Sequence, residues 1–367
     1  TMYLADLGAT VVTVERPGTG DDTRAWGPPW TEHTSSYFES VNRSKQSVTL
    51  DLTDPGDRAL AHELARRADV LVENFLTGTL ERYGLGYDQL AISNPRLVYA
   101  SITGFGSGAG ADRPGYDFLV QALGGLMSIT GSPDGEPQKV GVALVDVLTG
   151  KDAVIGVLAA LAVRRHTGRG QHVEVNLLSS LLGSLVNQAS GFLTTGRAPA
   201  AMGNRHPSIT PYELYACADG HLAIACGNDG QFQRLAAALD LPAVASDPAY
   251  ATNALRVAHR EALASALESR LREASAEHWE QRLGAAGVPA GRVGDLDSAF
   301  RLATELGLDP TYAVPGADGH APQVRNPIRF SDHEPAREMP PPDLNQHGVR
   351  VRAWLAGPDS ERLDPIG

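Results

Sequence analysis

The first half of the chain alternates short β-branched segments with helical segments, and this alternation limits the possible folds more than any other feature. The strand-like segments are bounded by turn residues and lie at 10–14, 47–50, 69–72 and 97–102. A charged amphipathic segment at 57–68 has the spacing of a helix. Strands that alternate with helices usually pair in parallel, with the helices covering the faces of the sheet. The sequence therefore predicts an α/β fold with a mainly parallel sheet.

This large domain is predicted to span residues 1–195. A long apolar helix is expected from Asp146 to about Arg165, followed by a strand at 172–175 and a second helix at 177–194. The first eight residues have the pattern of the end of a helix. We therefore expect the natural chain to begin earlier and the first strand of the domain to precede Thr1.

A small α+β domain is predicted at 196–314, after a Gly- and Ala-rich boundary segment at 196–205. Asp219 and Gly220 form a strong two-residue hairpin signal. The expected elements are strands at 213–217 and 221–226 and helices near 230–239, 253–274 and 276–286. The last segment, 315–367, is rich in Pro and Gly, and we expect it to return to the large domain with a strand at 324–330 and a helix at 346–355.

Composition narrows the possible partners and the compartment. The chain has 31 Lys and Arg against 43 Asp and Glu, a net charge of -12, which disfavours binding to nucleic acid or to an anionic membrane. It has two cysteines, and the hairpin predicts that Cys217 and Cys226 lie opposite other residues rather than each other. Few cysteines are typical of a reducing compartment, so a cytoplasmic location is expected. No segment is long and apolar enough for a transmembrane helix.

Generic catalytic motifs are weak or absent. Residues 104–109 satisfy the spacing of a dinucleotide fingerprint, but Gly110, Pro114 and Gly115 follow where the phosphate-binding helix would begin. Gly150-Lys151 lacks the rest of a P-loop, and neither a zinc-binding spacing nor a nucleophile elbow occurs. No metal site and no tightly bound cofactor are expected.

Asp146 is the most informative single residue. It ends an apolar segment and begins the long helix, so it has two interpretations. Asp is a preferred N-cap residue, and a purely structural cap is the first interpretation. The second is a catalytic carboxylate, held ionised at the helix N-terminus and able to act as a nucleophile.

Many spaced motifs together resemble the class III CoA-transferases, a family that includes formyl-CoA and carnitine CoA-transferases and the α-methylacyl-CoA racemases. The matching segments cover nearly the whole chain and lie at 4–9, 14–18, 42–45, 72–75, 115–127, 130–135, 146–150, 167–171, 203–207 and 288–291. The resemblance implies a Rossmann-like large domain and an interlocked homodimer. It also implies acyl-CoA and a carboxylic acid as substrates.

By this resemblance Asp146 is the nucleophile that attacks the acyl-CoA thioester, giving a mixed anhydride and then an enzyme-bound thioester. Asp117 matches the position of a second carboxylate near the nucleophile, although it could also be the cap of the helix that follows. Tyr116 occupies the position of the racemase histidine, and a phenol with an unperturbed pKa of about 10 is a poor base at neutral pH. Transfer is therefore favoured over racemisation.

The resemblance also implies a CoA site and a substrate site. The candidate CoA-binding residues are Arg16, Lys45, Leu50, Asn74, Phe75, Arg82, Arg113 and Tyr116. The candidate substrate residues are Tyr37, Gly203, Asn204 and His206. The last three lie where family members bring a mobile segment over the acyl group. Arg205 and His206 suggest a dicarboxylate substrate, whose distal carboxylate they could pair.

Two other functions remain open. A racemase or epimerase would exchange the α-hydrogen of its acyl-CoA with solvent and would need no acceptor acid. A catalytically silent CoA-binding protein would bind CoA without ever forming an adduct at Asp146.

Overall fold

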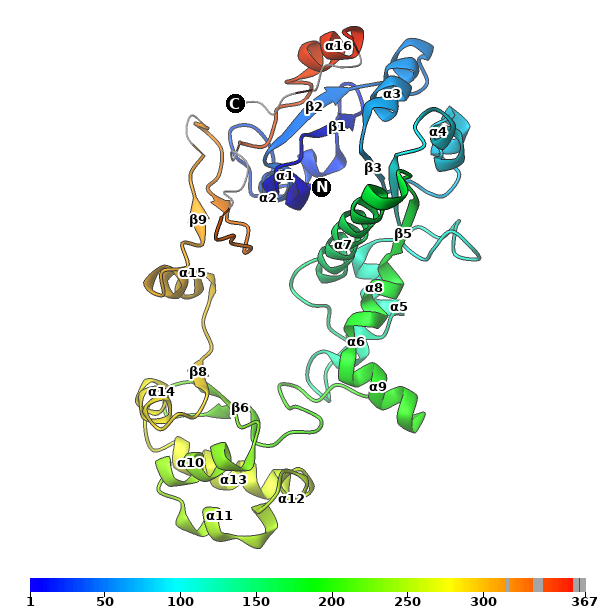
Figure 1. Cartoon of the computed structure of the whole chain (residues 1–367). Helices are drawn as coiled ribbons and strands as arrows, with labels where there is room; N and C mark the ends of the chain where they lie inside the picture. Colours follow the sequence, from blue (N-terminus) through cyan, green and yellow to red (C-terminus); the bar gives the residue numbers. More distant parts are fainter. Residues whose placement is uncertain (315–316, 333–338, 359–362, 364–367) are drawn as a thin grey trace. The chain divides into compact units, whose positions relative to one another are not determined.

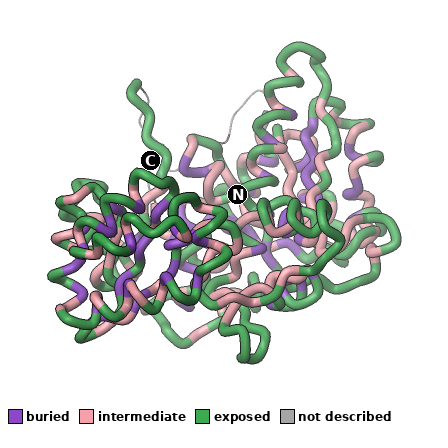
Figure 2. Tube along the Cα trace, turned by 90° about the horizontal axis from the view of Figure 1, so that it is seen from below, coloured by how far each residue is buried: buried purple, intermediate pink, exposed green. Residues whose placement is uncertain are grey.

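The computed structural model describes residues 1–314, 317–332, 339–358 and 363, and divides into two compact units (Figure 1). The first contains residues 1–124, 141–189 and 307–367, and the second contains 125–140 and 190–306. The sequence places the boundaries at 195 and 314 and leaves 125–140 in the large domain, so the second unit takes in a loop that sequence patterns assign elsewhere. Buried residues, purple in Figure 2, gather in the interior of each unit.

The first unit contains two parallel sheets. In one, β1 (Val11–Glu15) pairs with β2 (Lys45–Thr49), with Val11 opposite Lys45 and Glu15 opposite Thr49. In the other, β4 (Val98–Thr103) lies between β3 (Val70–Glu73) and β5 (His172–Asn176). The predicted mixed α/β fold with parallel pairing is confirmed.

Helices separate these strands along the chain. They are α1 (Met2–Asp6), η1 (Asp22–Ala25), α2 (Ser36–Asn42), α3 (Pro55–Arg67), η2 (Leu80–Tyr83), α4 (Tyr87–Ser93), α5 (Asp117–Leu123), α7 (Leu144–Thr167), α8 (Leu177–Ser184) and α16 (Gly348–Ala356). Local sequence explains several ends. Asp54 caps α3 by accepting hydrogen bonds from Gly56 and Asp57, and Gly168 ends α7 in the left-handed conformation.

Two groups of buried side chains hold the first unit together. Val98, Ala100, Val157 and Ala160 pack α7 against β4. A larger cluster, separate from the first, contains residues of β2, α3 and α4 and also Val351 and Leu355 of α16. Burial of these two apolar side chains fastens the C-terminal helix to the first unit. Two short strands, β9 (Thr311–Tyr312) and β10 (Gln323–Val324), pair antiparallel in the preceding segment.

The second unit is built on an antiparallel sheet. Its strands are β6 (Tyr212–Ala216), β7 (His221–Ala225) and β8 (Ala290–Arg292). Its helices are α6 (Leu126–Ile129), α10 (Asp229–Ala238), α11 (Pro242–Ser246), η3 (Pro248–Tyr250), α12 (Asn253–Ala258), α13 (Arg260–Leu271), α14 (Ala276–Ala285) and α15 (Leu296–Glu305), with most of α9 (Val186–Thr195).

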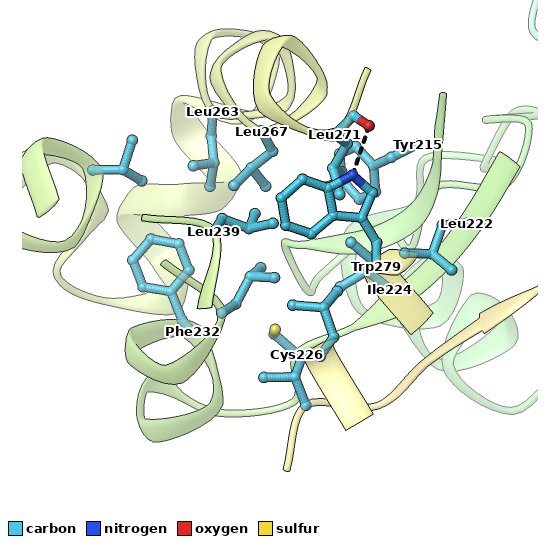
Figure 3. Packing of buried hydrophobic residues seen from close by; sticks show 14 of the residues in the cluster. Tyr215, Leu222, Ile224, Cys226, Phe232, Leu239, Leu263, Leu267, Leu271 and Trp279 are labelled. Atoms are coloured by element: carbon cyan, nitrogen blue, oxygen red, sulfur yellow. Dashed lines mark hydrogen bonds between the residues drawn. The ribbon is translucent and has the colours of Figure 1, made fainter. Parts of the chain in front are cut away.

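One continuous apolar core fills the second unit (Figure 3). Trp279 lies at its centre, 1% exposed, and its indole Nε1 donates a hydrogen bond to the Leu271 carbonyl at 2.8 Å. The bond satisfies the one polar atom of a side chain that is otherwise suited to the core.

Four local predictions need correction. The helix expected at 177–194 is divided at Leu185 into α8 and α9. The backbone N–H of Cys217 donates a hydrogen bond to the Gly220 carbonyl, so the hairpin turn is at 218–219. The strand register therefore differs from the one that a turn at 219–220 would give. Contacts outside the hairpin favour this register, because Asp219 accepts a hydrogen bond from the Ala276 backbone. The helix expected at 253–274 is broken at His259, and the strand expected at 324–330 is only β10. Both cysteines are free.

None of the helices among the described residues is long and apolar enough to cross a bilayer.

Candidate active site

Asp146 lies in the first turn of α7 and is not its N-cap. The helix begins at Leu144, and its N-cap is Ala143, whose methyl side chain cannot accept a hydrogen bond. The cap interpretation of Asp146 is therefore wrong, because the apolar residues before it belong to the helix. Its carboxylate is left free of the capping role, near a helix end that carries partial positive charge.

Asp117 supplies the missing cap from another helix. It is the first residue of α5, and its Oδ1 accepts hydrogen bonds from the backbone N–H groups of Val145 at 2.7 Å and Asp146 at 3.4 Å. Its Oδ2 accepts a bond from Gln121 Nε2 at 2.6 Å. Two carboxylates that are 29 positions apart in the sequence are thereby brought together at the start of α7.

The electrostatics of this pair favour a reactive carboxylate. Asp146 has exposed surface in the single chain, yet the protein around its carboxyl group removes part of the surrounding water. This desolvation, and then the negative charge of Asp117, raise the pKa of Asp146 to about 6. The pKa of Tyr37 is also raised, by burial and then by the charges of Asp146 and Asp117, so its phenol stays protonated. Tyr37 is 39% exposed, with its ring 5.1 Å from that of Trp26.

The basic candidates Arg16 and Lys45 lie on the β1–β2 pair. Arg16 follows the last residue of β1, is exposed, and forms an ion pair with Asp22. Lys45 is the first residue of β2, and its Nζ donates to Asn42 Oδ1 at 2.7 Å. Burial lowers the pKa of Lys45 to about 8. Both side chains belong to the first unit, as Asp146 does.

The other CoA candidates fall into two classes. Phe75 follows β3 and is 49% exposed, with its N–H bound to Glu73 Oε2 at 2.9 Å. Asn74 and Arg82 are also exposed. Leu50 is 4% exposed and packs in the core, so its side chain has little surface to offer a ligand.

The segment before α5 presents two further candidates. The Arg113 guanidinium lies 5.1 Å from the centroid of the Phe105 ring, a cation–π contact that holds the loop. Tyr116 is the N-cap residue of α5, makes no side-chain capping bond, and is 66% exposed.

Gly203, Asn204 and His206 belong to the second unit. The Gly203 N–H donates to the Gly131 carbonyl at 2.9 Å, and both loops line a cavity of about 670 Å³. His206 Nδ1 accepts a bond from the Ser208 N–H, and its carbonyl accepts one from Arg260. These hydrogen bonds hold both ends of this short segment within its own unit.

Arg205 is already paired inside the second unit. Its guanidinium contacts Glu213 at 3.0 Å and binds both carboxylate oxygens of Glu261, at 2.6 and 3.0 Å. These residues line a second cavity, of about 540 Å³. An acceptor carboxylate would have to compete with two glutamates for the same guanidinium.

Sequence patterns did not single out Gln121. Its only signal was a polar residue inside the apolar run that follows Asp117, four positions after it.

Within the described residues, no group of three or more His, Cys, Asp or Glu is placed to hold a metal ion.

Comparison with known proteins gives the family. Residues 1–348 match the family model described as CoA-transferase family III. The chain belongs to this family. The succinate–glutarate CoA-transferase of Agrobacterium fabrum is 41% identical, with 96% of this chain and 90% of that protein covered. The acetyl-CoA:oxalate CoA-transferase of Acetobacter aceti is 39% identical, with 98% and 92% covered.

A solved structure agrees with this assignment. The crystal structure of a CAIB/BAIF family protein from Brucella suis is 43% identical, with a TM-score of 0.85 and coverage of 96% of this chain and 94% of that chain. The chain is a class III acyl-CoA:carboxylate CoA-transferase.

Proposed function

We propose that this family III enzyme moves CoA from an acyl-CoA donor to a free carboxylic acid through covalent intermediates on Asp146. The observation that carries the proposal is the carboxylate pair at the start of α7, in which Asp117 is held by hydrogen bonds while the Asp146 carboxylate is left for chemistry.

The proposed reaction balances without any redox step or cofactor. An oxygen of Asp146 attacks the thioester carbonyl of the donor, the C–S bond breaks, and CoA leaves as its thiolate, giving a mixed anhydride. The thiolate then attacks the Asp146 acyl carbon, releases the donor carboxylate, and leaves a CoA thioester on the enzyme. The acceptor carboxylate repeats these two steps in reverse, which forms the new acyl-CoA and regenerates the Asp146 carboxylate.

The surroundings of Asp146 suit a nucleophile that works near neutral pH. With a pKa of about 6, the carboxyl group is mostly ionised at pH 7, yet it is more basic than an ordinary aspartate. We propose that Asp117 acts beside it through charge and helix capping. The protonated Tyr37 phenol is a hydrogen-bond donor for the carboxylate or acyl oxygen of a substrate.

The CoA site is proposed in the first unit. Arg16, Lys45, Arg82 and Arg113 would provide the positive charge that CoA phosphates require, despite the net charge of -12. Phe75 has exposed ring surface for the adenine, and Asn74 and Tyr116 would add polar contacts. Leu50 would contribute through its backbone.

The relatives suggest the class of acid. Their names refer to succinate, glutarate and oxalate, and we propose that this enzyme also uses dicarboxylates, with succinyl-CoA as a donor. Gly203, Asn204 and His206 remain the proposed substrate residues of the second unit.

We further propose a Rossmann-like large domain, a cytoplasmic location and an interlocked homodimer. The parallel strand pairs support the first, and the two free cysteines fit a reducing compartment. Helices α9 and α15 support the dimer, since neither buries a residue although both carry large apolar side chains, including Phe192, Leu193, Leu296 and Leu302.

Product analysis tests the proposal. The enzyme is incubated with succinyl-CoA and, in separate reactions, glutarate, oxalate or mesaconate, and the acyl-CoA products are identified by mass. Formation of the matching acyl-CoA with release of succinate is expected. Incorporation of solvent deuterium at the α-carbon of a branched acyl-CoA, with no transfer to any acid, would instead support a racemase.

A further inference from the structure

Gln121 is a fully buried amide in an otherwise apolar stretch of α5. It is 0% exposed, and its neighbours Val120 and Ala122 are apolar. A buried amide costs free energy unless its polar atoms have partners. Gln121 Nε2 meets this need by donating to Asp117 Oδ2 at 2.6 Å, and it also lies 3.4 Å from the Val142 carbonyl. The side chain thus links α5 to the segment that leads into α7.

The bond to Gln121 determines which oxygen of Asp117 faces α7. Positions i and i+4 lie on the same face of a helix, so the Gln121 amide reaches back to the carboxylate without strain. With Oδ2 held there, Oδ1 is directed to the N–H groups of Val145 and Asp146. All three partners are donors, so each of these hydrogen bonds uses the Asp117 carboxylate as the acceptor.

We propose that Gln121 is a positioning residue for the transfer reaction, because its buried amide holds Asp117 in the orientation that caps α7 and faces Asp146. The inference rests on the proposed function of Asp146. It adds a third residue, which touches neither substrate nor the reacting atoms.

Removal of the amide has a defined physical consequence. Asp117 Oδ2 would lose its donor, and the carboxylate would be free to rotate toward water. Asp146 would then feel less negative charge, and its N–H would lose its acceptor. The groups that interact electrostatically with Asp146 are Asp117 from α5 and Tyr37 from α2, and the phenol stays neutral throughout the working pH range.

Two substitutions of similar size separate positioning from packing. Gln121→Met removes the donor and should lower the pKa of Asp146. Gln121→Glu places a second carboxyl group beside Asp117, so the two share a proton at low pH and repel each other once it is lost. The added charge should raise the pKa of Asp146. Thr149→Val is the matched control, because Thr149 is equally buried and donates to the Val145 carbonyl at 2.7 Å without touching either carboxylate.

The measurement is the titration of Asp146 in full-length protein labelled with 13C at the aspartate side-chain carboxyl carbons, with the resonance assigned by its loss in Asp146→Asn. We expect a lower midpoint in Gln121→Met, a higher one in Gln121→Glu, and the wild-type midpoint in Thr149→Val. Midpoints that stay at the wild-type value in both Gln121 variants, or that move in the same direction, would overturn the proposal. Circular dichroism confirms that each variant is folded.

Kinetics give a second, independent readout. Succinyl-CoA is mixed with excess enzyme, and release of CoA thiol is followed in a single turnover from pH 5 to 8. Gln121→Met should release CoA about 10-fold or more slowly with little change in succinyl-CoA affinity, since positioning acts on the chemical step. Gln121→Glu, in which the pKa of Asp146 is expected to be higher, should reach its plateau rate only at a higher pH than wild type, so its largest loss of rate is expected at acid pH. Equal losses at every pH in both variants would contradict positioning.

The two proposals fail in different ways. If wild-type enzyme releases no CoA from succinyl-CoA, the proposed covalent reaction fails for that donor, whereas the titration of Asp146 still decides the role of Gln121.

Discussion

The two units each gather two carboxylates in a cluster, but only in the second unit does an arginine pair with them. In the second unit Arg205 binds Glu213 and Glu261, so each carboxylate has a guanidinium partner. In the first unit Asp117 and Asp146 approach each other, and among the described residues neither forms an ion pair. The partners of Asp117 are an amide and two backbone N–H groups.

The contrast separates a structural role from a chemical one. The Arg205 cluster costs little charge energy, because opposite charges meet, and it fastens the 203–207 segment to β6 and α13. In the Asp117–Asp146 pair, desolvation and then the negative charge of Asp117 raise the pKa of Asp146. Such perturbed groups are concentrated at sites where a reaction uses them. We therefore expect the first cluster to govern stability and the second to govern rate.

The largest effect is expected for Asp146→Asn. An amide cannot form the mixed anhydride, so kcat should fall by about 1,000-fold or more, while KM for succinyl-CoA changes by less than about 3-fold. Steady-state transfer assays with purified, folded variant measure both constants. A kcat within tenfold of wild type would remove Asp146 from the chemistry.

A smaller and pH-dependent effect is expected for Asp117→Asn. In wild type, the rate should fall about tenfold per pH unit below about pH 6, because the attacking carboxylate becomes protonated there. Without the charge of Asp117 the pKa of Asp146 drops, so this acid limb should move to lower pH. The less basic nucleophile should also react about 10-fold or more slowly on the plateau. An acid limb that does not move would show that Asp117 does not act through its charge.

The smallest effect on rate is expected for Arg205→Leu. Glu213, whose side chain is 7% exposed, would lose its guanidinium partner, and the second unit should be destabilised by about 1–2 kcal/mol, after allowance for the solvent that screens Arg205. The midpoint of thermal unfolding should fall, and kcat should stay within about 3-fold of wild type. A KM for glutarate raised about 100-fold, with unchanged stability, would instead show that Arg205 pairs the distal carboxylate of a substrate.

Local patterns predicted most elements of both units but not the relations between distant ones. The parallel strands of the first unit were predictable because β-branched runs between turn residues leave few alternatives. The start of α7 was not, since the apolar residues before Asp146 fit a strand or a helix equally well. The structure resolves this by capping the helix with Asp117, 29 residues away, which no local rule can predict.

The candidate site shows the same division. The resemblance to a family identified Asp146 and Asp117 as a pair, and the structure brings them together. The sequence does not single out Gln121, because a lone polar residue in an apolar helix can be given a role only once its hydrogen-bond partner is known. The hairpin turn lies one residue before its predicted position for a related reason. The Asp219 side chain accepts a hydrogen bond from the backbone N–H of Ala276, a contact outside the hairpin.

Covalent modification of Asp146 is the most direct test of the central claim. The enzyme is incubated with succinyl-CoA, trapped with hydroxylamine or borohydride, and analysed by intact mass and peptide mapping, with Asp146→Ala as the control. The account predicts a modification on the peptide that contains Asp146, confined to that residue and absent from the variant. An unmodified Asp146 in enzyme that is actively transferring CoA from succinyl-CoA, or the same adduct in Asp146→Ala, would contradict it.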